Sequence, residues 1–543
     1  MKKVLPIGND QFRDVRERGA YYVDKTLMIR DFIDYGNIAA LITRPRRFGK
    51  SLNMTMLRDF FDITQNSLEL FNGLAIMNTE YRTEMNTRPV IYLSFKDCSG
   101  KTPDILRTRL NTVLAKEYER YDRIFRGSID ENGFYERIFY RSLDRLNYEA
   151  ASFTELSSMI ENLMRLVKRF YARAPLLLLD EYDQPILSSY ENGYHEELGD
   201  FFSVFYGSAL KGNEDLWLAL LTGIQRVAKE SIFSKLNNIS VYTVLDRQYS
   251  EYFGLTESET RTVLEDYGLE LNAQVKAMYD GYCFGGLEMY NPWSVLNYAN
   301  RGLLRNYWVN TSTNYLIHSA LKSATGYFMD SFDTLISQGA VETGVNLETS
   351  FIEQQSDYSL WGLLVNSGYL TVPEEKGGLL MKLVIPNEEV ASEFQNLVAE
   401  YAHIRNPDLD VMFQCLFQQD MKGFMDSYSR IVLDCTSYYD SSENAYHMLF
   451  LGMCAALRGL YRVNSNRESG LGRSDITLEA LREGDIHIIV EFKQGKDIEV
   501  LKETALKQIL DRKYYAGLTG SVLCIGLAHS KKNCAMAYKR LEC

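Results

Sequence analysis

The sequence predicts an α/β protein with a parallel sheet in its N-terminal half and a second, smaller α/β domain at its C-terminal end. Two short apolar runs, at 38–43 and 176–179, indicate the first sheet, because each has the length and residue type of a buried parallel strand. Two β-type runs between residues 470 and 493, joined by a glycine-containing polar turn, form an expected hairpin and indicate the second domain.

The first apolar run leads into the octet Arg44-Pro45-Arg46-Arg47-Phe48-Gly49-Lys50-Ser51. In the phosphate-binding pattern G-x-x-x-x-G-K-[ST], backbone amides cradle phosphates, the lysine reaches the β- and γ-phosphates, and the hydroxyl holds Mg²⁺. The octet keeps the Gly-Lys-Ser end, but Arg44 stands where the pattern has its first glycine. Apolar residues at helical spacing follow at 52–61, so the loop is expected at a helix N-terminus, which favours an anion. The alternative is a basic turn that contains Gly-Lys-Ser by chance.

The residues expected to contact nucleotide from this loop are Arg44, Arg46, Arg47, Phe48, Gly49, Lys50, Ser51 and Leu52. The second apolar run ends in Asp180 and Glu181. In a P-loop nucleotidase that strand edge faces the nucleotide, so Asp180 is expected to hold Mg²⁺ together with Ser51, and Glu181 to polarise the attacking water. Taken alone, the same pattern also fits a strand that runs into a solvated turn.

A third apolar run, 216–221, ends in Thr222, and Arg226 follows four residues later. At the tip of a parallel strand, Thr222 is placed to sense the γ-phosphate of bound nucleotide. Arg226 is placed to compensate charge in the transition state, as positioned arginines do in phosphoryl transfer. An ordinary strand-to-helix turn explains Arg226 equally well.

Composition limits the classes of protein that fit. At 543 residues the chain is longer than one hydrophobic core usually serves, so three or four domains are expected. The eight cysteines contain no C-x-x-C pair and the six histidines no H-E-x-x-H cluster, which argues against a zinc site or a disulfide framework. Any metal is therefore expected to be a hard cation on oxygen ligands.

The charge and hydropathy of the chain limit its partners and its location. A net charge of −13 argues against a general nucleic-acid coat, although it leaves room for a local basic groove. No run of about 18 apolar residues and no signal peptide are evident, so a cytoplasmic protein without a membrane partner is expected.

A second chemical centre is expected in the C-terminal hairpin. Asp475 lies in its first run, while Glu491 and Lys493 lie two apart in its second run and so share one face. Two carboxylates and an ammonium match Mg²⁺-dependent phosphodiester hydrolysis, with Asp475 and Glu491 as metal ligands and Lys493 orienting water or stabilising charge. The alternative is an exposed hairpin with cross-strand salt bridges. Glu443 before the hairpin and Gln508 after it resemble the accessory positions of PD-(D/E)xK nucleases.

Together these motifs resemble two known families. The segment Tyr22-Val23-Asp24-Lys25-Thr26, the octet and the Leu-Asp-Glu-Tyr-Asp strand edge resemble the bacterial AAA-ATPase-like family, which itself writes the loop without its first glycine. The tail from about Ser441 resembles the PD-(D/E)xK nuclease superfamily, with Ser474 in place of the proline. The resemblance implies an additional-strand P-loop NTPase core with a helical lid, a restriction-endonuclease-like domain, and ATP and Mg²⁺ as cofactors.

The expected domains are a P-loop core at 1–250, a helical lid at 251–330, a middle module at 331–400, and a helical linker with the nuclease-like domain at 401–543. The middle module is expected to be winged-helix-like, because 360–372 reads as helix then strand, 379–385 as strand, and 386–390 as the start of a helix.

Two functions are compatible with the sequence. The first is an ATP-binding, ATP-hydrolysing protein whose nucleotide state controls a Mg²⁺-dependent nuclease acting on nucleic acid, DNA rather than RNA. The alternative is a nucleotide-dependent interaction or scaffold protein whose nuclease-like domain does not cut, which the acidic charge favours. The oligomeric state stays open, a homo-oligomer included.

Overall fold

The computed structural model divides the chain into two compact units. The first comprises Met1–Ala320 with Thr343–Glu389, and the second comprises Leu321–Glu342 with Val390–Cys543. The structure describes residues 2–130, 132–226, 238–308, 325, 327–328, 331–332, 334–335, 339–347, 356–393, 406–434, 446–447, 449–450, 453–457, 460–469, 472–482 and 484–543.

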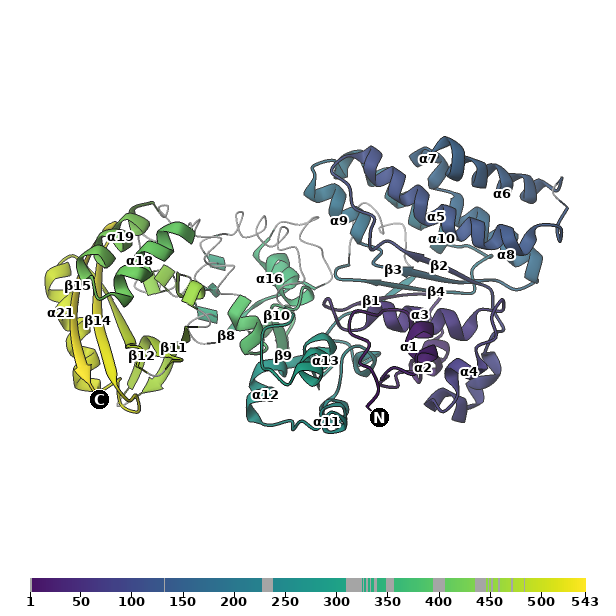
Figure 1. Cartoon of the computed structure of the whole chain (residues 1–543). Helices are drawn as coiled ribbons and strands as arrows, with labels where there is room; N and C mark the ends of the chain where they lie inside the picture. The colour runs from purple at the N-terminus through teal and green to yellow at the C-terminus, as the bar shows by residue number, and fades with distance from the viewer. Residues whose placement is uncertain are drawn as a thin grey trace. The chain divides into compact units, whose positions relative to one another are not determined.

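The first unit is built on a five-stranded parallel sheet in the order β2-β3-β4-β1-β5 (Figure 1). Its strands are β1 (Ala39–Thr43), β2 (Val90–Ser94), β3 (Leu176–Asp180), β4 (Leu218–Gly223) and β5 (Ile239–Tyr242). The three strands expected from the sequence are confirmed as β1, β3 and β4. Because β4 lies between β1 and β3, the sheet has the additional-strand order that the resemblance implied, and the carboxyl ends of all three strands meet at one edge.

Helices cover both faces of this sheet (Figure 1). On one face lie α5 (Pro103–Phe125), α6 (Phe134–Asp144), α8 (Met159–Tyr171) and α10 (His195–Leu210), and on the other lie α1 (Phe12–Glu17), α2 (Met28–Tyr35), α3 (Lys50–Phe61) and α4 (Leu68–Phe71). The start of α5 illustrates how the sequence sets these elements: Thr102 caps it by accepting the Ile105 N–H, and Pro103 occupies its first turn. Buried leucines of β3 and the aromatic residues of α5 and α10 share one core.

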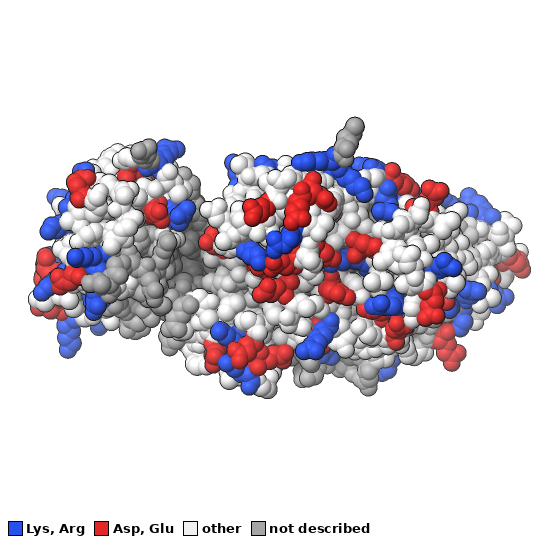
Figure 2. Space-filling model, turned by 90° about the horizontal axis from the view of Figure 1, so that it is seen from below, with Lys and Arg blue, Asp and Glu red and all other residues white. Residues whose placement is uncertain are grey.

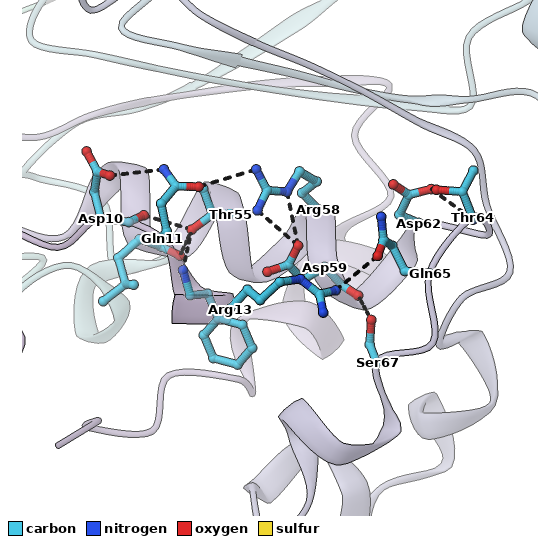
Figure 3. Close-up of polar contacts among 12 residues, drawn as sticks. Asp10, Gln11, Arg13, Thr55, Arg58, Asp59, Asp62, Thr64, Gln65 and Ser67 are labelled. Carbon is cyan, nitrogen blue, oxygen red and sulfur yellow. Dashed lines mark hydrogen bonds and ion pairs between the residues drawn. The ribbon is translucent and has the colours of Figure 1, made fainter. Parts of the chain in front are cut away.

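The N-terminal segment is fixed to α3 by a network of polar side chains (Figure 3). Thr55 Oγ1 donates to the Asp10 carbonyl at 2.9 Å and accepts the Phe12 N–H at 3.0 Å. Arg58 donates to the Gln11 side chain at 3.4 Å. Because α3 begins at Lys50, this network holds the first residues of the chain to the helix that follows the basic octet.

The lid and the middle module follow the core in the chain. The lid contains α11 (Glu257–Asp266), α12 (Ala273–Tyr279), β6 (Tyr282–Phe284), β7 (Leu287–Met289) and α13 (Pro292–Arg301). The middle module contains β8 (Ala340–Gly344), α16 (Asp357–Asn366), β9 (Thr371–Gly377) and β10 (Leu380–Val384), with its sheet in the order β8-β10-β9. The expected sequence of helix, hairpin and helix start is confirmed, and β8 adds a third strand that the pattern did not indicate.

The middle module packs tightly on the lid. Gly281 has a φ of +95°, and a Cβ at this position would lie 1.9 Å from the Pro386 carbonyl oxygen. The Cys283 N–H donates to Thr371 Oγ1 at 2.8 Å. Only a glycine therefore fits where the two segments meet. The module belongs to the first compact unit over Thr343–Glu389, whereas residues 340–342 of β8 belong to the second.

Glu389 gives the first unit an expected pH dependence. This buried carboxylate accepts the Trp308 N–H at 2.9 Å and the Ser294 hydroxyl at 2.7 Å, and burial raises its pKa from 4.5 to about 7. Since the folded pKa lies above the unfolded one, its contribution to stability is complete below about pH 4.5 and is lost as the pH rises through 7. The complete loss is about 3 kcal/mol.

We therefore expect the melting temperature of the wild type to fall relative to that of Glu389→Gln between pH 5 and 7.5. Differential scanning fluorimetry of both proteins across this range measures the difference. A constant difference between the two melting temperatures would show that the carboxyl group does not titrate on unfolding.

The second unit contains a five-stranded sheet in the order β11-β12-β13-β14-β15. Its strands are β11 (Tyr461–Ser469), β12 (Gly472–Ala480), β13 (His487–Gln494), β14 (Ser521–Ser530) and β15 (Asn533–Glu542), and its described helices include α18 (Asn406–Phe417), α19 (Met421–Asp434) and α21 (Ile498–Arg512). The expected hairpin is confirmed as the antiparallel pair β12–β13, whereas β13 and β14 are parallel and α21 connects them. A Cβ at Gly526 in β14 would lie 2.4 Å from the Lys502 carbonyl oxygen, so this glycine lets α21 approach the sheet.

Candidate functional site

The basic octet forms a loop around the Lys50 ammonium group. Gly49 adopts the left-handed conformation, with a φ of +85°, and α3 begins at the next residue, so that Ser51 and Leu52 lie in its first turn. Lys50 is buried, and its Nζ donates to the carbonyl oxygens of Arg44 and Pro45, both at 2.8 Å. Burial lowers the pKa of Lys50 to about 8, although the neighbouring carboxylates oppose this effect. The result is a curled loop with a central cation at a helix N-terminus.

The side chain of Arg44 is directed to the neighbouring strand and the lid. Its Nη1 donates to the carbonyl oxygens of Tyr242, at 3.1 Å, and Thr243, at 2.6 Å. The guanidinium lies 5.7 Å from the ring centre of Phe253 and 5.3 Å from that of Phe284. Complete burial lowers its pKa to about 10. The guanidinium therefore braces the loop, and only the backbone of Arg44 stays a predicted nucleotide contact.

Restoring the missing glycine is expected to harm the protein. Arg44→Gly removes a buried guanidinium, leaves the carbonyls at the end of β5 without their donor and opens a void, so the free energy of unfolding of the first unit should fall by about 2–4 kcal/mol. Urea denaturation followed by circular dichroism measures this loss. The matched control is Arg46→Gly in the same loop, for which a loss below about 1 kcal/mol is expected because its side chain is partly exposed. Equal losses for both variants would contradict the bracing role.

The rest of the octet is also held by distant residues. Phe48 is buried, with its ring centre 4.9 Å from that of Tyr282. Arg47 has a φ of +70°, and its guanidinium stacks 4.1 Å from the ring centre of Trp293. Burial raises the pKa of Glu181 and the charge of Arg46 opposes this rise, which indicates that this arginine is near the acidic strand edge. Nucleotide contacts from these three side chains remain predictions.

The acidic residues after β3 converge with the tip of β4. Thr222 Oγ1 donates to Asp180 Oδ1 at 2.6 Å, and both side chains are buried. Glu181 is held in the left-handed region, with a φ of +51°, and burial together with the charge of Asp180 raises its pKa. Lys50 opposes this rise, so the two carboxylates, Thr222 and the loop lysine share one electrostatic environment.

The acidic and basic residues of the C-terminal hairpin also come together. The Asp475 carboxylate accepts the Phe492 N–H at 2.8 Å, and Glu491 accepts the Asp475 N–H at 3.4 Å. Lys493 Nζ lies 3.5 Å from Glu491 Oε1, and the Gln508 side-chain amide from α21 donates to the same oxygen. Four of the five residues expected here therefore form one cluster, and Glu443 lies outside the described residues.

Two family models match separate parts of the chain. Residues 6–233 match the family model described as Predicted AAA-ATPase, and residues 441–539 match that of the PD-(D/E)XK nuclease superfamily. The chain is thus similar to the first family over residues 6–233, called the AAA-ATPase-like region below, and to the second over residues 441–539, called the nuclease-superfamily region. A curated relative, described as an uncharacterized protein in the vnfD 5′ region of Azotobacter chroococcum mcd 1, is 27% identical over 384 residues. That match covers 68% of this chain and 64% of the relative's length.

In the nuclease-superfamily region, burial dominates the electrostatics. Glu491 is 1% exposed, and burial, followed by repulsion from Asp475, raises its pKa to about 8. Burial also raises the pKa of Asp475. His447 and Tyr514 extend the cluster. His447 contacts the Asp475 carbonyl at 3.1 Å, and the Tyr514 hydroxyl accepts a hydrogen bond from Gln508 at 3.1 Å. The carboxylates therefore carry an electrostatic cost that a cation between them would relieve.

In the AAA-ATPase-like region, the structure adds a third acid that the sequence analysis did not single out. Asp183 is buried, and its Oδ2 accepts the N–H groups of Ile224, at 2.8 Å, and Gln225, at 3.0 Å. It thereby fixes the turn after β4 that leads to Arg226, beyond which residues 227–237 are not described. The sequence could have indicated Asp183, because it is the last acid of the Asp-Glu-Tyr-Asp segment that follows the second apolar run.

The signature segment near the N-terminus fastens the lid. Lys25 Nζ donates to Glu259 of α11 at 2.7 Å and to the Glu251 carbonyl at 2.5 Å, while Asp24 accepts the Thr26 N–H at 2.9 Å. The sequence analysis used this segment only as a family marker. Its lysine is in fact a buried ion-pair partner that ties the core to the first helix of the lid.

Charged side chains of both signs lie on the surface of the molecule. On the face shown in Figure 2, acidic and basic side chains of the described residues are interspersed, without a broad area of one charge. Within the same described ranges, no helix has the length and apolar character needed to cross a bilayer.

Proposed function

We propose that this protein binds and hydrolyses ATP at the octet, and that its nucleotide state controls Mg²⁺-dependent cleavage of nucleic acid by the second unit. The proposal rests on both family matches and above all on one observation, the buried cluster of Asp475, Glu491, Lys493 and Gln508. A scaffold has no need of two mutually repelling carboxylates in its interior, because burying two like charges beside one another is costly.

The first centre fits ATP and Mg²⁺. Lys50 supplies a buried cation at the N-terminus of α3, and loop amides supply donors for phosphate. Ser51 and Asp180 would hold Mg²⁺, while Thr222 keeps the Asp180 carboxylate in place through its hydroxyl. Glu181, with its raised pKa and its place next to Asp180, is suited to accept a proton from water.

The second centre fits a divalent cation on oxygen ligands. Asp475 and Glu491 would be the ligands, and the metal would activate water and polarise the phosphodiester. Gln508 orients the Glu491 carboxylate, and Lys493, which also donates to the Phe492 carbonyl at 2.8 Å, keeps a positive charge beside it. Lys493 is thereby positioned to stabilise negative charge that develops on the substrate.

Metal and substrate assays on the full chain test this proposal. Isothermal titration calorimetry is expected to detect ATP binding and Mg²⁺ binding, and cleavage assays with single-stranded DNA, duplex DNA and RNA are expected to show Mg²⁺-dependent cutting, strongest on DNA. The rate should differ between ATP, ADP and nucleotide-free conditions. Nucleotide binding without metal binding or cleavage would favour the scaffold alternative. The net charge of −13 also supports that alternative, because it disfavours nucleic-acid binding.

A further inference from the structure

Residues from three distant segments cover Pro45, Arg46 and Phe48 of the octet. A Cβ at Gly368, which has a φ of +86°, would lie 2.8 Å from Pro45 Cβ. Trp308 Nε1 donates to the Arg46 carbonyl at 3.3 Å, and the Phe48 ring packs on the lid. The loop is therefore in close contact with β6 of the lid, with Trp308 beyond α13, and with the middle module.

Trp308 occupies the central place among these contacts. It is 1% exposed, and its ring centre lies 5.4 Å from that of Tyr369. Its side chain reaches the loop at Arg46, and its backbone N–H donates to Glu389 at 2.9 Å. One residue thus connects the loop to Glu389 through two hydrogen bonds.

Glu389 is the last residue of the first unit, which the chain also leaves after Ala320, and the second unit resumes at Val390. Its carboxylate also accepts the Ser294 hydroxyl, so α13 of the lid holds it as well. A displacement of the loop backbone at Arg46 would therefore reach the start of the nuclease-bearing segment through close-packed groups, which have little room to absorb it.

We propose that Trp308 is a positioning residue that transmits the nucleotide state of the octet to Glu389 and so to the chain that enters the second unit. This inference rests on the proposed nucleotide binding at the octet. The group that would link the octet to Glu389 is the buried indole N–H of Trp308.

Fluorine NMR of the full chain labelled with 5-fluorotryptophan tests the inference without an activity assay. The chain has four tryptophans, and single Trp→Phe variants assign their resonances. A non-hydrolysable ATP analogue with Mg²⁺ is expected to shift the Trp308 resonance by more than its linewidth. Trp217 is the internal control, because its backbone N–H donates to the Pro175 carbonyl at the opposite end of the parallel sheet, and its resonance should stay in place.

The possible results separate the inference from the function on which it rests. If calorimetry shows that the analogue binds but the Trp308 resonance does not move, the relay is wrong and nucleotide binding stands. An equal shift of Trp217 would indicate a global change and would also overturn the relay. If the analogue does not bind, the proposed function itself fails, and the relay with it.

The variant Trp308→Phe provides the functional test. It keeps an aromatic ring but removes the donor to Arg46. The dissociation constant for ATP is expected to change less than about threefold, and nucleotide-free cleavage should be unchanged. The difference in cleavage rate between ATP and ADP should fall at least threefold. An undiminished difference in a folded variant would overturn the inference.

Discussion

Replacing Lys50 with alanine is expected to lower ATP hydrolysis by about two to three orders of magnitude. Its ammonium is the buried cation of the octet, and in the structure it donates only to two carbonyls of the loop itself, among the hydrogen bonds of the described residues. Those bonds are exchangeable for bonds to phosphate oxygens, which are stronger because both partners are charged. Alanine cannot supply them.

A coupled ATPase assay and a melting curve for each variant measure the effect. The matched control is Lys25→Met, which removes an equally buried ammonium outside the loop: Lys25 is 8% exposed and Lys50 is 7% exposed. Loss of the Lys25–Glu259 pair should lower the melting temperature while hydrolysis stays within about tenfold of the wild type. Equal losses of hydrolysis in the two variants would assign the effect of Lys50→Ala to destabilisation.

Much of the first unit could be predicted because chemistry-bearing residues follow its central strands directly. The runs that became β1, β3 and β4 are apolar, short and followed by the octet, by Asp180 or by Thr222, so position along the chain was sufficient. β2 and β5 are the two edge strands and are not followed by a recognisable motif, and β5 is only half-buried, so neither was singled out.

The roles that escaped prediction depend on contacts between residues far apart in the chain. The sequence places Arg44 in the loop, but the direction of its side chain depends on carbonyls about 200 positions later, at Tyr242 and Thr243. No local pattern indicates the contacts of Trp308 and Glu389, because their partners, Arg46 and Ser294, lie far away in the chain. The residues of the hairpin centre could be predicted more directly, because side chains two residues apart in a strand, such as Glu491 and Lys493, lie on the same face.

Replacing Glu491 with glutamine is expected to have opposite effects on activity and on stability. The amide keeps the size of the side chain but removes a metal-ligating charge, so Mg²⁺ binding should be lost and cleavage should fall by about three orders of magnitude. The same change removes a buried carboxylate that Asp475 repels, so the free energy of unfolding of the second unit, measured without metal, should rise by about 1–3 kcal/mol. ATP hydrolysis should be retained, because the nucleotide residues lie in the other unit.

Calorimetric metal titration, a cleavage assay and urea denaturation of the full chain together test this expectation. Glu479→Gln is the matched control: Glu479 lies in β12 of the same sheet, 3.5 Å from Arg462, and its replacement should leave metal binding and cleavage unchanged. A stabilised variant that has lost cleavage identifies Glu491 as a group kept for chemistry at the expense of stability. A destabilised variant that still cuts would show instead that Glu491 supports the fold through Gln508 and Lys493, and that the ligands of the metal lie elsewhere.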